Sequence, residues 1–302
     1  MKKLTVCGIL IAALCVAPAA MARVAPIPYA ALGDSYSAGE GNDPFDGSCH
    51  RAERADSAYP RILPGLVGYL DAPSFHACTG AVTADVWKRP QPGRPGQAAQ
   101  TDYLRPGDRL VTLTIGGNDL RFSSILAECL LRIDCTRSEL AREVNADLAT
   151  IVPKLVAVYA HVRADMSASG YLVVAGYPHL FALGPDAGCN PLISPHESAW
   201  IDRLVDRGNA RIAAAAQAAA RADGNVFYID VTGEFAGHEL CTDDPWLHGL
   251  KLSIHEGLNL VQGSYHPTPD GQRAYATAIA AFLRRPGVRS ALTASATPRS
   301  AY

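Results

Sequence analysis

The sequence predicts a single three-layer α/β/α domain built on a mostly parallel five-stranded sheet. Short apolar and β-branched runs alternate with segments whose apolar residues recur at helical spacing, which is typical of a parallel sheet covered by helices. The 302 residues suffice for one large domain or two small ones. The proline- and glycine-rich stretch 89–96 is a loop, but the alternation resumes on both sides of it. We therefore interpret it as a surface insertion in one domain spanning 23–285.

The first 22 residues have the features of a secretion signal. Lys2 and Lys3 precede an apolar run over 6–16, and a small-x-small cleavage motif occupies 20–22. The run is shorter than the about 20 residues that a membrane-spanning helix needs. We therefore expect cleavage near Ala22, secretion to an extracellular or periplasmic location, and no integral membrane segment in the mature chain.

Five segments have the character of strands. The runs 110–115 and 171–175 are almost continuously apolar or β-branched, as in strands that are buried on both faces. The predicted strands are 29–32, a weak one near 74–77, 110–115, 171–175 and 226–229. Their alternation with helical patterns along the chain accounts for the predicted parallel sheet.

Helix-start signals separate these strands. Thr136 with Glu139 and Ser194 with Glu197 have the spacing of capping boxes, and Thr268 precedes a proline at a first helical position. The three helices should extend to about residues 162, 224 and 282. A further helix is expected over 120–131, capped by Asn118 or Asp119. The small, polar residues 286–302 are predicted to form a loosely ordered tail.

Charge and cysteine content narrow the classes of function. The formal net charge is −2, which gives no electrostatic reason to expect a nucleic-acid partner. Of eight cysteines, six lie outside the signal segment: Cys49, Cys78, Cys129, Cys135, Cys189 and Cys241. An even number in an exported chain predicts three disulfides. No CxxC spacing occurs, so we expect no metal site.

Two glycine-containing blocks follow the first two predicted strands. Ser35 lies between Gly33 and Gly39, directly after the first strand, where open α/β folds bind their ligands. Gly80 follows the weak second strand and can present its backbone N–H to an anion with no side chain in the way. Each block taken singly is equally compatible with an ordinary turn.

Two further blocks carry an amide and an imidazole. Asn118 follows the pair Gly116-Gly117 at the end of the strongest strand, and its side chain can face the same edge of the sheet as Ser35. His266 lies in a loop that leads directly into the last predicted helix. A lone histidine in such a place is more often a surface residue than a base.

Taken together and in this order, the blocks around Ser35, Gly80, Asn118 and His266 closely resemble the SGNH (GDSL-like) hydrolase family. The resemblance extends over about 29–283 of the chain. It implies a flavodoxin-like α/β/α fold and hydrolysis of carboxylic esters through an acyl-enzyme intermediate. Neither a cofactor nor a metal is needed for this chemistry.

The resemblance also implies a role for each residue. Ser35 would be the nucleophile and His266 its general base, because a serine hydroxyl reacts well only when a base removes its proton. The backbone N–H groups of Ser35 and Gly80 and the side-chain amide of Asn118 would form the oxyanion hole, whose donors each contribute about 3–4 kcal/mol.

One departure from the family concerns the group that orients His266. Many members carry an aspartate three residues before the histidine, where this chain has Gly263. Ser264-Tyr-His266-Pro instead resembles secreted actinobacterial-type members in which a backbone carbonyl orients the ring. We therefore expect a Ser-His dyad with the carbonyl of Gly263 or Ser264 as acceptor. Asp270 is the rival, but its position favours a role at the helix terminus.

The same resemblance implies the disulfide pairs Cys49–Cys78, Cys129–Cys135 and Cys189–Cys241. The first would join the loop after the Ser35 block to the residues just before Gly80. Such a bridge would restrict the unfolded chain and hold the site in its reactive geometry.

Other classes fit the sequence less well. No serine has the Gly-x-Ser-x-Gly context of α/β-hydrolases, and His255-Glu256 is followed by Asn259 where a zinc hydrolase needs histidine. A non-enzymatic binding module would be free to lose Ser35, Asn118 or His266, yet all three are present.

The resemblance implies a small-molecule or lipid ester as substrate, and it favours a lipase or phospholipase over a carbohydrate O-acetyl esterase. The segment 238–260 either forms an apolar acyl-binding wall or simply packs in the core. Its large apolar residues are Trp246, Leu247, Leu250, Leu252, Leu258 and Leu260. We expect the protein to be a monomer.

Overall fold

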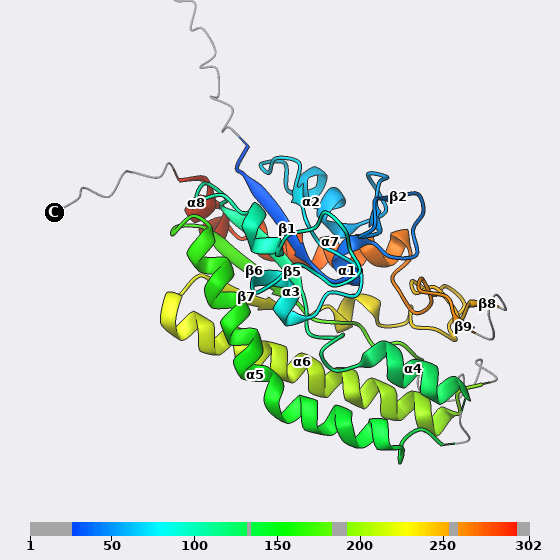
Figure 1. Ribbon diagram of the computed structural model, residues 1–302. Coiled ribbons are helices and arrows are strands. Elements are labelled where there is room, and N and C mark those ends of the chain that lie inside the picture. Colours follow the sequence, from blue (N-terminus) through cyan, green and yellow to red (C-terminus); the bar gives the residue numbers. More distant parts are fainter. Residues whose placement is uncertain (1–25, 132–133, 183–191, 254–258, 295–302) are drawn as a thin grey trace, which may run out of the picture.

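The computed structural model describes residues 26–131, 134–182, 192–253 and 259–294 (Figure 1). Its centre is a five-stranded parallel sheet in the order β4-β1-β5-β6-β7. The strands are β1 (Tyr29–Gly33), β4 (Ser74–Phe75), β5 (Leu110–Thr114), β6 (Tyr171–Ala175) and β7 (Val226–Ile229). The predicted three-layer α/β/α fold with a parallel sheet is therefore confirmed.

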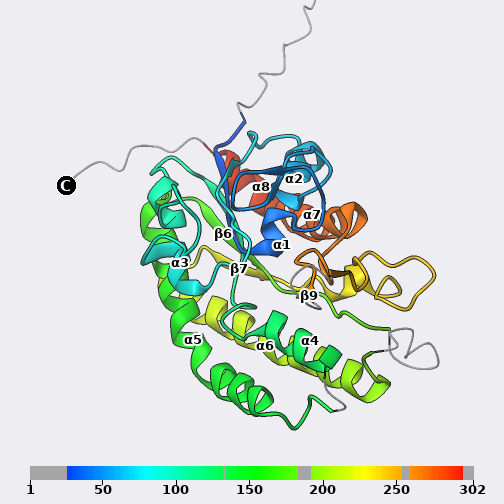
Figure 2. The same ribbon diagram turned by 45° about the vertical axis from the view of Figure 1, so that its right-hand side comes forward.

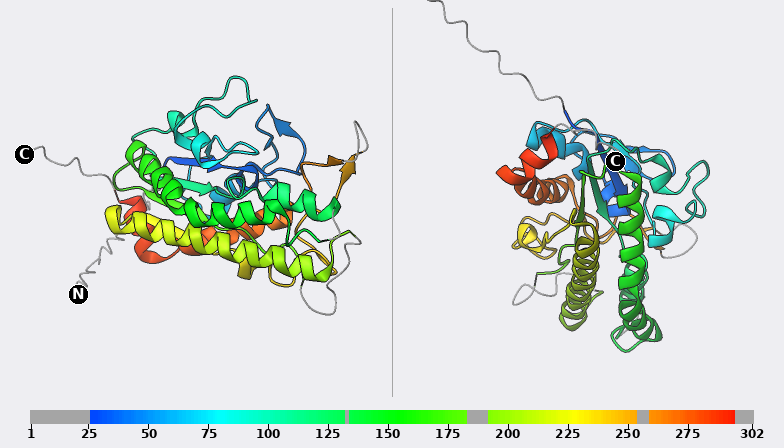
Figure 3. Two further views of the ribbon diagram at one scale, coloured as in Figure 1. Left: turned by 60° about the horizontal axis from the view of Figure 1, so that its bottom comes forward. Right: turned by 90° about the vertical axis from the view of Figure 1, so that its left-hand side faces the viewer.

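Helices cover both faces of this sheet (Figures 1 and 3). On one face, α2 (Tyr59–Val67) packs against α7 (Pro269–Leu283). On the other, α5 (Glu139–Asp165) packs against both α3 (Thr83–Trp87) and α6 (Pro195–Asp223). Figure 2 shows α4 (Phe122–Leu131) running beside α6.

Shorter elements complete the described chain. They are α1 (Ser35–Ala38), η1 (Gln100–Tyr103), η2 (Thr232–Phe235), α8 (Pro286–Thr293) and two hairpins, β2 (Phe45–Asp46) with β3 (Arg51–Ala52) and β8 (Leu252–Ser253) with β9 (Asn259–Leu260). No helix within the described residues is both long and apolar enough to cross a membrane.

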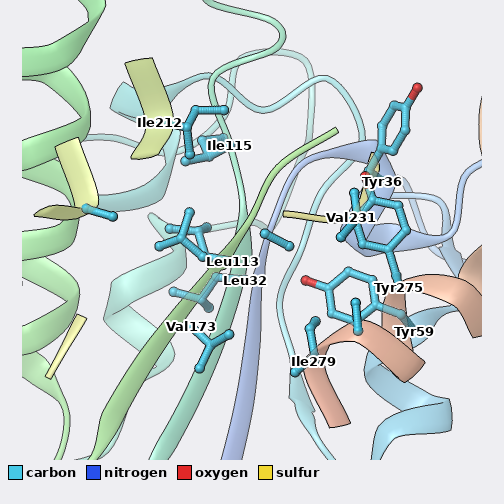
Figure 4. Close-up of a cluster of buried hydrophobic side chains, with 14 of the residues drawn as sticks. Leu32, Tyr36, Tyr59, Leu113, Ile115, Val173, Ile212, Val231, Tyr275 and Ile279 are labelled. Atoms are coloured by element: carbon cyan, nitrogen blue, oxygen red, sulfur yellow. The ribbon is translucent and has the colours of Figure 1, made fainter. Parts of the chain in front are cut away.

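The core lies on both sides of the central strands. Figure 4 shows Ile115, which follows β5, beside Ile212 of α6, with Leu113 and Val173 further along the sheet, whereas Tyr59 of α2 and Tyr275 of α7 lie together on the other side of the strands. The rings of Tyr59 and Tyr275 stack with their centroids 5.5 Å apart. Burial of these side chains on both faces explains the continuous apolar character of β5 and β6.

Two of the three predicted helix starts are confirmed and one is wrong. Ser194 caps α6 in a complete capping box with Glu197, and Thr268 caps α7 ahead of its proline. Helix α5 begins later than expected, with Ser138 as its N-cap. Thr136 is unavailable because Asp134 Oδ1 accepts both its N–H and its hydroxyl, at 2.9 and 2.6 Å.

Residues 286–293 are more ordered than expected. Residues 286–293 form α8, and Leu292 on this helix is fully buried. The Arg109 guanidinium donates hydrogen bonds to the carbonyls of Ala291 and Ala294, at 3.0 and 2.6 Å. These contacts anchor the helix to the start of β5, which explains why a polar segment is ordered there.

Candidate active site

The blocks that contain Ser35, Gly80 and Asn118 meet because the strands before them are neighbours in the sheet. Strand β1 lies between β4 and β5, with Gly33 opposite Thr114. Carboxyl ends of parallel strands lie at one edge of a sheet, so the residues that follow these three strands converge there. Ser35, Gly80 and Asn118 consequently line one cavity.

A sharp turn presents the Ser35 hydroxyl at the end of β1. Gly33 has a φ of +129°, and an added Cβ would lie 2.5 Å from the carbonyl oxygen of Thr114, so only glycine fits. The next residue, Asp34, caps α1 by accepting the N–H of Tyr36 at 3.1 Å. The turn therefore makes Ser35 the first residue of α1.

His266 contacts both Ser35 and a backbone carbonyl. Its Nε2 lies 2.7 Å from Ser35 Oγ, and its Nδ1 lies 3.0 Å from the carbonyl oxygen of Ser264. A carbonyl can only accept, so Nδ1 carries the proton and donates to Ser264. Nε2 is then the acceptor for the Ser35 hydroxyl. Asp270 lies on the exposed first turn of α7, where it belongs to the helix terminus.

The loop that carries His266 is held by backbone hydrogen bonds on both sides of the ring. His248 N–H donates to the carbonyl of His266 at 2.8 Å, and Tyr265 N–H donates to the carbonyl of His248 at 2.9 Å. Tyr265 has a φ of 63°, and its carbonyl accepts the Tyr36 hydroxyl at 2.9 Å. The imidazole is therefore oriented by a rigid loop.

The surroundings of His266 favour its neutral form. The pKa of His266 is lowered to about 4, chiefly because the ring is removed from water; the hydrogen bond to the Ser264 carbonyl opposes this change and the nearby His248 adds to it. A neutral imidazole at ordinary pH is the form that accepts a proton from serine.

The loops after β4 and β5 are joined by two side chains. Asn118 Nδ2 donates to the carbonyl of Ala81 at 2.9 Å. The Asp119 carboxylate accepts the N–H and the hydroxyl of Thr83, at 2.8 and 2.6 Å. Asp119 thus serves the start of α3, and α4 begins only at Phe122, later than the expected 120–131 helix.

The cavity beside Ser35 has a volume of about 630 Å³. Its apolar wall comes from Leu120, from Phe122 and Leu126 of α4, and from α6 and its neighbours, including Leu180, Leu204, Val205 and Ile212. Such a wall between two helices suits an extended apolar group.

Within the segment 238–260, none of the described residues 238–251 lines this cavity. Trp246 stacks on His238 with ring centroids 3.6 Å apart and meets the edge of Phe235, and Leu247 is buried away from the cavity. Leu258 lies outside the described residues. Ordinary packing, one of the two alternatives, therefore accounts for Trp246 and Leu247.

Sequence reasoning missed a buried polar cluster beneath Ser35. Asp34 accepts hydrogen bonds from the hydroxyls of Tyr177 and Thr114, and the Tyr177 hydroxyl also accepts the N–H of Gly117 at 3.1 Å. Burial raises the pKa of Asp34 to about 6 despite these donors. The only signal in the sequence was the position of Tyr177, two residues beyond β6.

Two disulfides are present among the described residues, Cys49–Cys78 and Cys129–Cys135. The expected partner Cys189 of Cys241 lies outside the described residues. Cys129, Cys135 and Glu197 are close enough to hold a metal, but the two sulfurs are bonded to each other. Glu197 also accepts hydrogen bonds from Ser194 and from the N–H of Cys135.

A serine paired with a neutral histidine at the carboxyl edge of an α/β/α sheet is the arrangement of a serine ester hydrolase. The chain belongs to the GDSL-like Lipase/Acylhydrolase family, which matches residues 31–274. It is therefore a carboxylic ester hydrolase.

Named relatives agree with this membership. A lipase of Streptomyces rimosus is 34% identical over 83% of this chain and 84% of its own length. The crystal structure of phospholipase A1 from Streptomyces albidoflavus NA297 superposes with a TM-score of 0.69, at 33% identity, over 85% of this chain and 99% of that one. An extracellular lipase structure from Streptomyces rimosus gives a TM-score of 0.67 at 31% identity, over 84% and 99% of the two chains.

Proposed function

We propose that this protein is a secreted esterase of the lipase or phospholipase type, with Ser35 as nucleophile and His266 as general base. The observation that carries the proposal is the 2.7 Å contact between Ser35 Oγ and His266 Nε2 at the end of an apolar cavity. The lipase and phospholipase A1 relatives support the lipid-ester substrate. Their resemblance and the signal-like start of the chain support secretion.

The proposed reaction has two halves. His266 Nε2 takes the proton of Ser35 while Ser35 Oγ attacks the ester carbonyl. The N–H groups of Ser35, Gly80 and Asn118 stabilise the resulting oxyanion, and the alcohol leaves with the proton from His266. Water then attacks the acyl-enzyme with His266 again as base, which releases the acid and restores Ser35.

The apolar wall between α4 and α6 is the proposed site for the acyl chain. Each buried methylene contributes about 0.8 kcal/mol, so a chain that fills the cavity gains affinity with length. An acetyl group would leave the wall uncovered. This reasoning favours a long-chain acyl ester over a sugar acetate.

Gly208 tests the acyl-chain assignment. It lies on α6 at the cavity wall, and a Cβ added there would be 3.3 Å from Cδ1 of Leu120. Gly208→Leu should lower kcat/KM for a palmitoyl ester about tenfold or more relative to an acetyl ester, because it displaces about two methylenes. The measurement is kcat/KM for chromogenic esters from acetyl to palmitoyl.

The exposed Ala210 on the same helix provides the control. Ala210→Val should leave the chain-length profile of the wild-type protein unchanged. Activity on acetyl esters alone, in wild-type protein, would contradict the lipid assignment and favour a carbohydrate O-acetyl esterase.

The low pKa of His266 predicts unusual acid tolerance. Because the neutral ring is the active form and its pKa is about 4, kcat/KM should stay constant from pH 7 to about 5. Below pH 4 it should fall about tenfold per unit. An acid limb near 6.5 would contradict the burial of the ring. A limb near 6 that disappears in Asp34→Asn would assign it to Asp34 instead.

A further inference from the structure

We propose that Gln91 and Arg94 are positioning residues that aim and polarise the peptide group joining Thr79 to Gly80, and so strengthen the oxyanion hole. This inference rests on the proposed function, in which the N–H of that peptide stabilises the oxyanion. Both residues belong to the loop 89–96, which the sequence marks only as a surface insertion.

The two side chains hold the carbonyl end of this peptide. Gln91 Nε2 donates to the carbonyl oxygen of Thr79 at 2.8 Å, and Arg94 Nη2 donates to the same oxygen at 3.2 Å. The peptide is trans, so its C=O and N–H point in opposite directions. Fixing the oxygen against the loop therefore directs the Gly80 N–H away from the loop.

The remaining polar groups of Thr79 are also held. Its hydroxyl donates to the buried carboxylate of Glu40 at 2.7 Å, and its N–H donates to the carbonyl of Cys49 at 3.0 Å. Gly80, which has a φ of +82°, lines the cavity with Ser35. The N–H of Gly80 is thus the part of this peptide left to bind a developing anion.

Arg94 contributes a positive charge as well as a hydrogen bond that positions the peptide. Its guanidinium is permanently cationic, and it bridges Thr79 to the carbonyl of Ser48, the residue before the Cys49–Cys78 disulfide. A cation on a peptide oxygen draws electron density toward it, which makes the N–H of the same peptide a stronger donor. This gain is greatest when an oxyanion forms, so it favours the transition state over bound substrate.

The orientation of the Gln91 amide indicates that its N–H₂ group is needed as a hydrogen-bond donor to Thr79. Gln91 Oε1 is buried and has no hydrogen-bond partner among the residues that the structure describes, an arrangement that costs stability. Exchanging the two amide atoms would set two acceptors against each other at Thr79. The amide also lies beside Gly80, where an added Cβ would lie 3.5 Å from Gln91 Nε2.

The experiment compares Gln91→Met, Arg94→Met and Arg94→Lys with wild type. Gln91→Met keeps the size of the side chain, removes the donor and also removes the unpartnered oxygen. For a soluble short-chain ester we expect each Met variant to lower kcat about tenfold or more with KM changed less than twofold. Arg94→Lys, which keeps a cationic donor, should recover most of the Arg94→Met loss.

Affinity for a trifluoromethyl ketone, which forms a tetrahedral adduct with serine, separates positioning from a purely structural role. Its inhibition constant should rise by the same factor as kcat/KM falls. Arg89→Gln, on the same loop but paired with Asp85, is the matched control and should leave kcat unchanged. A lower thermal midpoint with kcat and inhibitor affinity intact would overturn the inference.

A failure of this inference can be told apart from a failure of the proposed function. If wild-type protein hydrolyses esters and Ser35→Ala does not, but kcat is unchanged in both Met variants, only the role of Gln91 and Arg94 is refuted. If folded wild-type protein hydrolyses no ester, the proposed function and this inference fall together.

Discussion

Ser35→Ala is expected to lower kcat/KM for acyl esters by about 10⁴-fold or more. The variant lacks the hydroxyl that contacts His266 Nε2 at 2.7 Å, so no acyl-enzyme can form. The residual rate would come from water attacking an ester bound in the oxyanion hole. The measurement is steady-state hydrolysis of a chromogenic ester, together with mass spectrometry of the wild-type protein after treatment with a phosphonate ester. Only the wild-type peptide that contains Ser35 should gain mass.

His266→Ala should cause a loss of similar size, and the double variant should lose little more, because the two residues act as one unit. Asp270→Ala is the matched control for the dyad. Asp270 is exposed on α7, whereas the Ser264 carbonyl already accepts from His266 Nδ1. A loss of activity in folded Asp270→Ala protein would contradict the dyad and indicate a triad.

The fold was predictable because its central strands β1, β5 and β6 are buried almost throughout. Strands β6 and β7 begin and end at the predicted residues, and β5 differs by one residue. A short, continuous β-branched run that lies between two capped helices can hardly form anything other than a buried strand. The site was predictable for a related reason, since parallel strands bring their carboxyl ends together without any knowledge of side-chain packing.

Features that depend on long-range contacts were not predictable. Helix α8 is stabilised by the Arg109 guanidinium, which lies far away in the sequence. The apolar wall of the cavity beside Ser35 comes largely from α4 and α6, and periodicity cannot say which core-facing stripe borders a cavity. The cap of α5 moved to Ser138 because of local competition from Asp134.

Among the proposed oxyanion donors, Asn118 is the one whose role can be tested most directly. One hydrogen of its amide bonds to the carbonyl of Ala81 at 2.9 Å, which orients the group and leaves the second hydrogen to face the cavity. The side chain is therefore fixed before substrate arrives and need not reorganise as the oxyanion forms. Asn118→Ala should lower kcat about 10²- to 10³-fold, with KM nearly unchanged.

Asn118 also helps to join the loops after β4 and β5, so a loss of activity in Asn118→Ala needs a comparison with a variant that weakens this junction alone. Thr83→Val removes one hydrogen bond of the Thr83–Asp119 pair and should cost about 1 kcal/mol of stability, measured by urea unfolding, with kcat almost unchanged. Asn118→Asp keeps the size of the side chain but sets a carboxylate beside the developing anion, and it should be slower than Asn118→Ala. If Thr83→Val lowered kcat as far as Asn118→Ala, the junction between the loops would be the essential feature. If Thr83→Val instead left kcat almost unchanged while Asn118→Ala lowered it, a single oriented N–H would supply about 3–4 kcal/mol of transition-state stabilisation.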